Sequence, residues 1–354
     1  DGFTKGRDRS FHFGVKELNI VGMISHLGPQ MGIADGIGLA KKLKGEKKAT
    51  VVFTGDGGTS EGDFHESLNV AAVWDLPVLF VIENNGYGLS TPNKEQFKGE
   101  SLATRGEGYG VESLSIDGNN IVEVYTTVKE KIESIRKNPR PILLECFTFR
   151  MRGHEEASGT KYVPKEVMEY WDNKDPVVNF ENYLLEKKVY TKGEVESLKE
   201  SIKSEISDAV KISFDNSKFI VQEEDELRDV FYPYTQKVKH PKEKSTSERR
   251  YVDAISDSLH QSMKKYKDLI IMGQDISDYG GVFKVTEGFV DKFGRDRVRN
   301  TPLCESAIVG TALGLSVEGI KSVVEMQFAD FVTCGFNQIV NNLAKIHYRW
   351  GQNA

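Results

Sequence analysis

Short apolar runs alternate with amphipathic stretches along the first half of the chain. Three runs, which begin at Ala49, Pro77 and Pro141, read ATVVFT, PVLFVI and PILLECF. They are short and almost entirely apolar, as the strands of a buried parallel sheet are. Between the last two runs, apolar residues recur at steps of three and four from Ile121 to Ile135, which predicts an amphipathic helix. The alternation indicates an α/β fold with a parallel sheet and crossover helices.

A polar segment then separates this region from a second α/β pattern. Thr191 and Glu194 form a capping box before an amphipathic helix that runs from Val195 to Val210. Residues 238–250, VKHPKEKSTSERR, lack apolar periodicity and are typical of a linker. Beyond them, DLIIMG and SVVEMQ indicate strands, and IVGTALGLSVEG indicates a glycine-bearing helix. We therefore expect a domain over residues 1–237 with a C-terminal helical extension, a linker over 238–250, and a second, incomplete domain over 251–354.

Composition narrows the class of protein without naming a function. Hydrophobic residues make up 38% and charged residues 28%, which is ordinary for a globular protein. The net charge of −6 gives no general attraction to nucleic acid or to an anionic membrane, and no apolar run reaches membrane-spanning length. Cys146, Cys304 and Cys334 lie in or beside apolar runs, so we expect reduced core thiols in a cytoplasmic protein. Because the chain has no initiator Met and stops after a helix-like segment, we expect that parts of the working protein are missing at both ends.

Polar oxygen-bearing side chains follow two of the predicted strands. Asp56 lies between glycines after ATVVFT, and Asn85 follows PVLFVI. The carboxyl ends of neighbouring parallel strands emerge at one edge of a sheet, where open α/β folds bind ligands. A carboxylate, an amide oxygen and a backbone carbonyl suit a hard divalent cation that also binds phosphate. A nucleotide-binding turn without metal and a plain strand-to-helix turn are the alternatives for GDGGTS alone.

Longer motifs resemble a known family. In the first half, GRDRSFHFG, SEGDFHESLNVAA, ENNGYGLSTP and FTFRMRGH resemble the α subunit of thiamine diphosphate-dependent 2-oxo acid dehydrogenases, the branched-chain type above all. After the linker, YGGVFKVTEGFVDKFGRDRVRNTPLCESAIVGTALGL and VVEMQFADF resemble the β subunit. The resemblance covers almost the whole chain. It implies two domains of the thiamine diphosphate-binding fold, each a mostly parallel sheet flanked by helices, fused in one chain.

The resemblance assigns a metal and diphosphate site to the GDGG and NNGYG motifs. Asp56 and Asn85 would bind Mg²⁺ through their side chains, and Tyr87 would bind it through its backbone carbonyl. Gly57 and Gly58 would let the backbone approach the diphosphate of thiamine diphosphate.

Five further residues match cofactor-contacting positions of the family. His154 would approach the diphosphate, Ser25 and Leu27 would contact the aminopyrimidine, and Phe331 would stack on it. Glu305 would bind a pyrimidine ring nitrogen and act as the catalytic acid/base through the cofactor, with His154 as the second catalytic residue. Without the resemblance, a solvated loop His is the better interpretation of His154. A core Leu and a helix N-terminal Glu are as good as a cofactor role for Leu27 and Glu305, and a core Phe is the alternative for Phe331.

The chain also differs from the family. The upstream Tyr–Arg pair that grips the diphosphate, a β-type histidine and the final β-type domain are absent from the sequence. Glu155 stands where some relatives carry a phosphorylated serine after the loop histidine, so we do not expect that switch. Pro29 replaces a hydroxyl residue at the monovalent-cation position of branched-chain relatives, which argues against that cation.

The function implied by the resemblance is oxidative decarboxylation of a 2-oxo acid. The acyl group would pass to the lipoyl group of a partner acyltransferase in a multienzyme complex, and a homodimer would form two interfacial sites. Transketolase-like or acetoin-cleaving chemistry, and a non-catalytic scaffold, are the alternatives. The 2-oxo acid stays open, with branched-chain acids, pyruvate and acetoin-related substrates all compatible with the sequence.

Overall fold

A parallel sheet forms the centre of the first half of the molecule. The computed structural model describes residues 2–9, 11–22, 25–155, 157–215, 221–238, 240 and 247–352. The four strands lie in the order β1-β2-β6-β5 and all pair in parallel. Their bounds are β1 (Thr50–Gly55), β2 (Val78–Asn84), β5 (Glu112–Asp117) and β6 (Ile142–Phe147). The predicted α/β class with parallel strands is confirmed.

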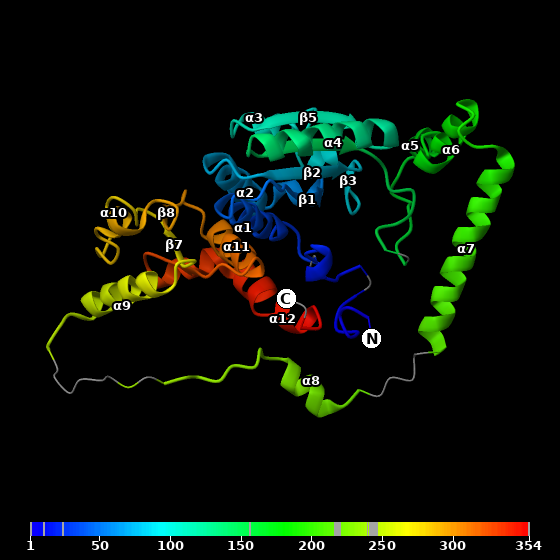
Figure 1. The fold of residues 1–354 in the computed structure, drawn as a ribbon. Helices are drawn as coiled ribbons and strands as arrows, with labels where there is room; N and C mark the ends of the chain where they lie inside the picture. The colour runs from blue at the N-terminus through cyan, green and yellow to red at the C-terminus, as the bar shows by residue number, and fades with distance from the viewer. Residues whose placement is uncertain are drawn as a thin grey trace.

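Helices cover this sheet on both faces. Helices α1 (Gln30–Leu43) and α2 (Gly62–Val73) lie on one face and α4 (Ile121–Lys137) on the other (Figure 1). Alternate residues of β2 explain the two layers, because Val78 and Phe80 belong to the core with α1 and α2, whereas Leu79 and Val81 pack with the apolar side of α4. The predicted crossover helices are therefore present.

Strand β1 differs from the prediction of a fully buried strand. Val51 and Phe53 are 39% and 55% exposed, while Val52 is buried. The strand lies at the edge of the sheet, and only one of its faces is covered. The apolar run was therefore a poor guide to the burial of both faces.

A smaller parallel sheet organises the second half. It has the order β8-β7-β9, with β7 (Ile270–Gly273), β8 (Val298–Asn300) and β9 (Ser322–Val324). The predicted glycine-bearing helix is α11 (Glu305–Val317). The remaining helices of this half are α9 (Tyr251–Lys265), α10 (Phe289–Phe293), η4 (Ala329–Gly335), η5 (Gln338–Leu343) and α12 (Ile346–Arg349).

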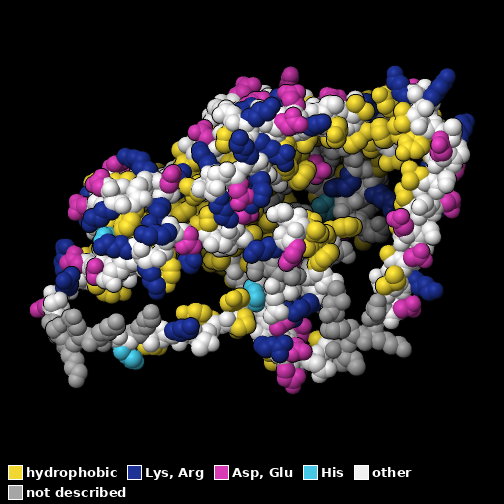
Figure 2. All heavy atoms as spheres, viewed as in Figure 1, with side chains coloured by type: hydrophobic (Ala, Val, Ile, Leu, Met, Phe, Trp, Pro, Cys, Tyr) yellow, Lys and Arg dark blue, Asp and Glu magenta, His cyan; other side chains and the backbone are white. Residues whose placement is uncertain are grey.

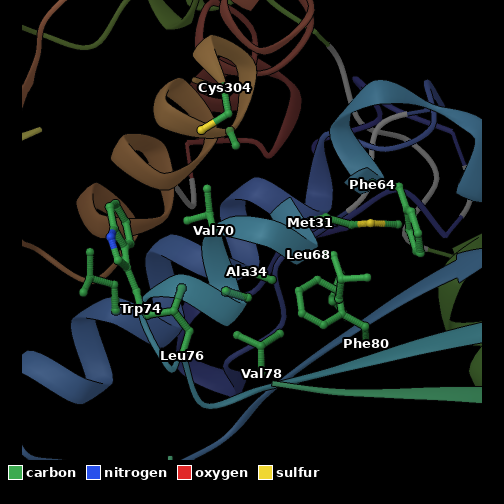
Figure 3. Close-up of a cluster of buried hydrophobic side chains, with 14 of the residues drawn as sticks. Met31, Ala34, Phe64, Leu68, Val70, Trp74, Leu76, Val78, Phe80 and Cys304 are labelled. Carbon is green, nitrogen blue, oxygen red and sulfur yellow. The ribbon is translucent and has the colours of Figure 1, made fainter. Parts of the chain in front are cut away.

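Helices α1 and α11 join the two halves by close packing. A Cβ added at Gly36 would overlap the carbonyl oxygen of Thr311, and one added at Gly314 would overlap that of Ile33. Glycine is required at both positions because the two backbones approach so closely. One hydrophobic core runs through this contact and includes residues of α1, α2, α11 and both sheets. Figure 3 shows part of it, with Met31, Leu68 and Phe80 close together and Cys304 farther away, above Val70 in this view.

The cysteines do not all lie in the core. Within the described residues all three are free thiols; Cys146 and Cys304 are buried, and Cys334 is exposed. The prediction of three core thiols is therefore wrong for Cys334, which lies in η4, a helix whose only buried residue is Gly335.

A helical extension follows the first sheet. It contains α5 (Lys165–Asp172), α6 (Pro176–Glu186), α7 (Lys192–Asp215) and α8 (Glu223–Asp229). The predicted capping box is present, because the Thr191 hydroxyl accepts the Glu194 N–H at 3.3 Å and the Glu194 carboxylate accepts the Thr191 N–H at 2.8 Å. Helix α7 stands apart from the sheets (Figure 1), and hydrophobic side chains lie at the surface around it (Figure 2).

Helix α8 is held by ion pairs to segments far away in the sequence. Arg7 binds Glu226 at 2.8 Å and Asp229 at 2.7 Å, and Lys5 binds Asp229 at 2.9 Å. Tyr348 of α12 donates to Glu226 at 3.0 Å. These residues form the α8 clasp, which ties α8 to the N-terminal segment and to α12.

The predicted linker over residues 238–250 lies partly outside the described residues. Residues 238, 240 and 247–250 are described, and they belong to neither a helix nor a strand. The domain boundaries at 237 and 251 stay predictions. Among the described helices, none combines the length and the apolar character that crossing a membrane requires.

Candidate functional site

Asp56 and Asn85 lie side by side at the carboxyl edge of the first sheet. Asp56 follows β1 and Asn85 follows β2, and these strands are parallel neighbours with Gly55 opposite Glu83. The backbone N–H groups of Gly57 and Asn85 both lie within hydrogen-bonding reach of the Asp56 carboxylate. The pairing of β1 with β2 therefore brings the backbone of Asn85 to the Asp56 carboxylate.

The Asp56 carboxylate is buried but not fully partnered. Its residue is 1% exposed, and its Oδ2 atom has no hydrogen-bond partner. Burial raises the pKa of the Asp56 carboxyl, although the nearby backbone N–H groups and the charge of Arg150 act in the opposite direction. A buried oxygen without a donor is costly by itself and fits the coordination of a cation.

The turn after β2 carries the other two metal-ligand candidates. The Asn85 Oδ1 atom accepts the N–H of Tyr87 at 3.0 Å, which closes the turn. The Tyr87 ring packs edge-on against Phe149 and Tyr162, with centroid distances of 6.3 Å and 5.6 Å. The aromatic packing holds Tyr87 in place, and the family role belongs to its backbone carbonyl rather than to the ring.

Asn84, beside Asn85, has a different role. Its Nδ2 donates to Glu145 Oε1 at 2.7 Å, and its Oδ1 accepts from Gly86 N at 3.1 Å and from Asn93 Nδ2 at 2.7 Å. All of its polar atoms are used within the protein. Asn84 therefore orders the turn, and Asn85 is the residue left for a ligand.

The glycines after Asp56 form a tight loop, η2 (Gly57–Ser60). A Cβ added at Gly57 would lie 3.1 Å from Gly88 Cα, and one added at Gly58 would overlap the Thr54 hydroxyl. Only a residue without a side chain fits at Gly58. The same loop is approached by Leu27, whose Cβ lies 3.7 Å from the added atom at Gly58.

The Ser25–Leu27 segment is open to solvent. Leu27 is 46% exposed, and the Ser25 hydroxyl lies 3.1 Å from His12 Nε2. Leu27 is therefore not an ordinary core leucine, which was the alternative to its role beneath a cofactor. Its position beside Gly58 is compatible with that role.

The loop after β6 returns over the turn that follows β2. Arg150 lies 3.2 Å from His154 Nδ1 and donates to the carbonyl of Leu89 at 3.3 Å. Its charge also acts on the Asp56 carboxyl. His154 itself is exposed. Because Arg150 contacts His154 and also acts on Asp56, it links the histidine loop to the Asp56 edge of the sheet.

Glu305 is the first residue of α11 and lies at the junction of the two halves. Its Oε1 accepts from Gln274 Nε2 at 3.0 Å. The first turn of α11 is capped by Glu66 of α2, whose Oε2 accepts the N–H of Ala307 at 3.0 Å. Burial raises the pKa of the Glu66 carboxyl, and the nearby charges of Asp63 and Glu305 add to this effect. Both interpretations of Glu305, cofactor partner and helix N-terminal acid, fit this geometry.

Phe331 lies in an aromatic cluster on η4, the helix whose Gly335 approaches the carbonyl of Glu305. Its ring packs edge-on against Phe328 at 5.3 Å, and Phe328 packs against Phe283 at 5.7 Å. Among the described residues no hydrogen bond or ion pair joins Glu305 to Asp56 or Asn85. The candidate residues thus form two groups, one on each half.

Two observations bear on the metal. Over the part of the chain that the structure describes, no cluster of three or more His, Cys, Asp or Glu side chains could hold an ion. A site at Asp56 would therefore use one carboxylate with neutral amide and carbonyl oxygens, a donor set that suits Mg²⁺. A pocket of about 480 Å³ is lined by Asn85, Tyr87 and Phe149 among others, and Asp56 does not line it.

Sequence reasoning missed Glu145 and Glu66. Glu145 is 0% exposed within β6. The sequence feature that could have identified Glu145 is its place inside the apolar run PILLECF, because a carboxylate buried in a strand needs several hydrogen-bond donors. Glu66 carries no comparable signal, because its partner lies on a helix 241 residues away.

Known proteins resemble both halves of the chain. The family model described as the dehydrogenase E1 component matches residues 1–220, and the transketolase pyrimidine-binding domain matches residues 247–353. The α subunit of acetoin:2,6-dichlorophenolindophenol oxidoreductase of Bacillus subtilis (strain 168) is 36% identical over 234 residues, 66% of this chain and 69% of the relative.

Two further relatives are named for 2-oxo acid dehydrogenases. The mitochondrial 2-oxoisovalerate dehydrogenase subunit alpha 1 of Arabidopsis thaliana is 35% identical over 211 residues, 59% of this chain and 44% of the relative. The pyruvate dehydrogenase E1 component subunit alpha of Rickettsia felis is 32% identical over 212 residues, 60% of this chain and 65% of the relative. The chain thus spans less than two thirds of the length of these two relatives.

Proposed function

The chain belongs to the family of thiamine diphosphate-dependent 2-oxo acid dehydrogenase E1 components, and we propose that it binds thiamine diphosphate with Mg²⁺ and decarboxylates a 2-oxo acid. The observation that carries the proposal is the buried Oδ2 atom of Asp56, which has no donor and lies beside Asn85 at the carboxyl edge of the sheet. A cation held by Asp56 and Asn85 would satisfy that oxygen and would supply positive charge for a diphosphate.

Each site residue has a defined task in this proposal. Asp56 and Asn85 hold the metal with the carbonyl of Tyr87, and the glycines at 57 and 58 let the diphosphate come close to the backbone. When bound, thiamine diphosphate supplies the carbon nucleophile that adds to the oxo group and takes up the electron pair released with carbon dioxide. Glu305 exchanges a hydrogen-bonded proton with a pyrimidine nitrogen, and Gln274 holds its carboxylate.

The remaining candidates shape the rim of the site. Leu27, Ser25 and Phe331 would hold the pyrimidine half of the cofactor, Leu27 by apolar contact, Ser25 at its border and Phe331 by stacking. His154 approaches the diphosphate and is oriented by Arg150. These assignments come from the family resemblance, and the positions of Leu27 beside the glycine loop and of Arg150 near Asp56 support them.

We also propose a homodimer that works with a lipoyl-bearing acyltransferase. The site residues fall into two groups, one on each half of the chain. Exposed apolar side chains near Glu305 could pack against a second copy of the chain. Leu303 and Phe336 are 81% and 61% exposed. The acyl group would leave the site on the lipoyl arm of the partner. A cytoplasmic location remains part of the proposal.

The substrate we favour is a branched-chain 2-oxo acid, because the motifs of the first half resemble that type most. Acetoin cleavage is the second candidate, because the relative named for acetoin is 36% identical to this chain over 69% of its own length. Small differences in pocket shape decide such choices.

One assay panel tests this function. The full-length protein is incubated with branched-chain 2-oxo acids, pyruvate and acetoin, and the acylation of a lipoyl domain is followed by mass spectrometry. We expect acylation with a branched-chain 2-oxo acid. Ketol transfer between sugar phosphates without lipoyl acylation would instead indicate transketolase-like chemistry. Absence of both reactions in a protein that also fails to bind thiamine diphosphate would indicate a scaffold.

A further inference from the structure

Glu145 is a completely buried carboxylate behind the candidate metal site. It is 0% exposed in β6, the strand next to β2. Burial acts to raise the pKa of its carboxyl, but hydrogen bonds to the carboxylate outweigh burial and hold the pKa below its usual range. The donors to its two oxygens are Asn84, Ser101, Leu102, Ala103 and Ser115. No cation is among them, so Glu145 is an anion satisfied entirely by neutral groups.

One set of these contacts reaches the turn that carries Asn85. Glu145 Oε1 accepts from Asn84 Nδ2 at 2.7 Å, which fixes the orientation of the Asn84 amide. The Asn84 oxygen then faces the N–H of Gly86, a residue with a φ of +84°. Because Asn85 lies between Asn84 and Gly86, its position follows from that of the buried carboxylate.

A second set reaches Asp56. Glu145 accepts the N–H groups of Leu102 at 3.1 Å and Ala103 at 3.2 Å, directly before α3 (Thr104–Glu107). Arg105 of α3 donates to the carbonyl of Thr59. Thr59 returns to Asp56, because its hydroxyl donates to the Asp56 carbonyl at 2.6 Å.

We propose that Glu145 is a positioning residue that fixes Asp56 and Asn85 at the separation a metal ion requires. The inference rests on the proposed function, because it concerns the same metal site. One oxygen of Glu145 controls the Asn85 turn through Asn84, and the backbone donors before α3 connect it to the Asp56 loop. A glutamine at this position has nearly the same volume, but one of its two oxygens is replaced by an NH₂ group. That group would face a backbone N–H of Leu102 or Ala103, and two donors cannot form a hydrogen bond with each other.

The test compares the full-length wild type with the Glu145→Gln and Asn84→Ala variants and with the double variant. Mg²⁺ affinity is measured by calorimetry at saturating thiamine diphosphate, and thermal unfolding is recorded in parallel. We expect Glu145→Gln to weaken Mg²⁺ binding by about 10- to 100-fold, the usual effect of losing a group that orients a metal ligand. We expect the loss of affinity in the double variant to be smaller than the two single losses combined, because both changes break the same Asn84–Glu145 hydrogen bond.

The matched control is Asp35→Asn, which alters another completely buried carboxylate, on α1. It should leave Mg²⁺ affinity unchanged. Wild-type Mg²⁺ affinity in a folded Glu145→Gln protein would overturn the inference and leave Glu145 a purely structural residue. If Glu145→Gln does not fold, Asn84→Ala decides, and unchanged Mg²⁺ affinity in that variant overturns the inference in the same way.

A readout without cofactor separates this inference from the proposed function. Amide hydrogen exchange in the cofactor-free protein should rise at residues 57–61 and 84–93 in Glu145→Gln and not in Asp35→Asn. If the wild type binds no Mg²⁺ with thiamine diphosphate, the proposed function fails, and increased exchange at both loops still supports the positioning role. Increased exchange at neither loop contradicts it.

Discussion

Asp56 meets opposite requirements in the free and the loaded protein. Its carboxylate is 1% exposed with one oxygen unpartnered, and burial raises the pKa of its carboxyl. Near neutral pH the ionised group therefore destabilises the cofactor-free fold relative to the unfolded chain. A bound cation removes this cost. Asp56 thus lowers the stability of the cofactor-free fold and is compensated only when a cation is bound.

Asp56→Asn should separate the two states. We expect the cofactor-free variant to be at least as stable as the wild type in urea unfolding, because a costly buried charge is gone. With Mg²⁺ and thiamine diphosphate at 100 times the dissociation constant, the wild type should gain about 2.7 kcal/mol and the variant nothing. An equal loss of stability in both conditions would show that Asp56 is only structural.

Asp35 predicts a pH dependence of folding. It is 0% exposed on α1, neither oxygen has a partner, and burial raises the pKa of its carboxyl well above its usual value. Burial also raises the pKa of the nearby Cys304 thiol, to about 12. A raised folded pKa contributes stability that is present below the unfolded value and is lost as pH rises toward the folded one.

Asp35→Asn should therefore become relatively more stable as pH rises. The advantage over the wild type should grow by up to about 1.4 kcal/mol per pH unit above the usual carboxyl pKa. Urea unfolding between pH 5 and pH 8 measures this slope. Wild-type and variant stabilities that change in parallel with pH would contradict the raised pKa of Asp35.

At the scale of elements, the α1–α11 contact holds the two halves together. Gly36 on α1 and Gly314 on α11 each face the backbone of the other helix. The N-terminus of α11 is also capped across the junction by Glu66. Glu305 is therefore positioned by a helix whose location depends on α1 and α2, the helices that flank the Asp56 loop.

Gly36→Ala should disrupt this contact. The added methyl group meets backbone atoms of α11, which cannot move aside as a flexible side chain would. We expect a loss of about 1–3 kcal/mol in the free energy of unfolding, as for other overpacked cores. Gly193→Ala in α7 is the control, because nothing lies within 4 Å of its added Cβ. Equal effects of the two substitutions would contradict the packing argument.

Local sequence patterns predicted the helices and strands better than they predicted which of these elements contact each other. The convergence of Asp56 and Asn85 followed from two adjacent apolar runs, because neighbouring parallel strands end at one edge. The donors to Glu145 come from residues 84, 101–103 and 115, which the strand order β1-β2-β6-β5 brings together. Periodicity does not encode that order. The exposure of Phe53 was missed for the same reason, because an edge strand and a central strand can share one apolar run.

At the scale of the whole molecule, the α8 clasp closes the chain on itself. Arg7 has a side chain only 4% exposed, although it binds acids more than 200 residues away. Hydrogen bonds from Arg7 and then Lys5 hold the pKa of Asp229 well below its usual range. A depressed folded pKa gives stability that is present above the unfolded value and is lost as pH falls. The clasp should therefore weaken in acid.

Arg7→Gln should release α8 at neutral pH as acid does in the wild type. We expect amide hydrogen exchange at residues 223–229 to rise at least several-fold, with no change in α9. Lys203→Gln, which breaks an exposed i,i+3 pair with Glu200, is the control and should change neither helix. Slow exchange of α8 in Arg7→Gln would mean that the clasp does not hold it.

The central claim is that Asp56 and Asn85 bind thiamine diphosphate through a divalent cation. Calorimetric titration of thiamine diphosphate into the full-length protein tests it most directly, with Mg²⁺, with a chelator, and with Asp56→Ala in Mg²⁺. We predict saturable binding in Mg²⁺, and none with the chelator or with Asp56→Ala. Binding of equal strength in all three titrations would contradict the claim.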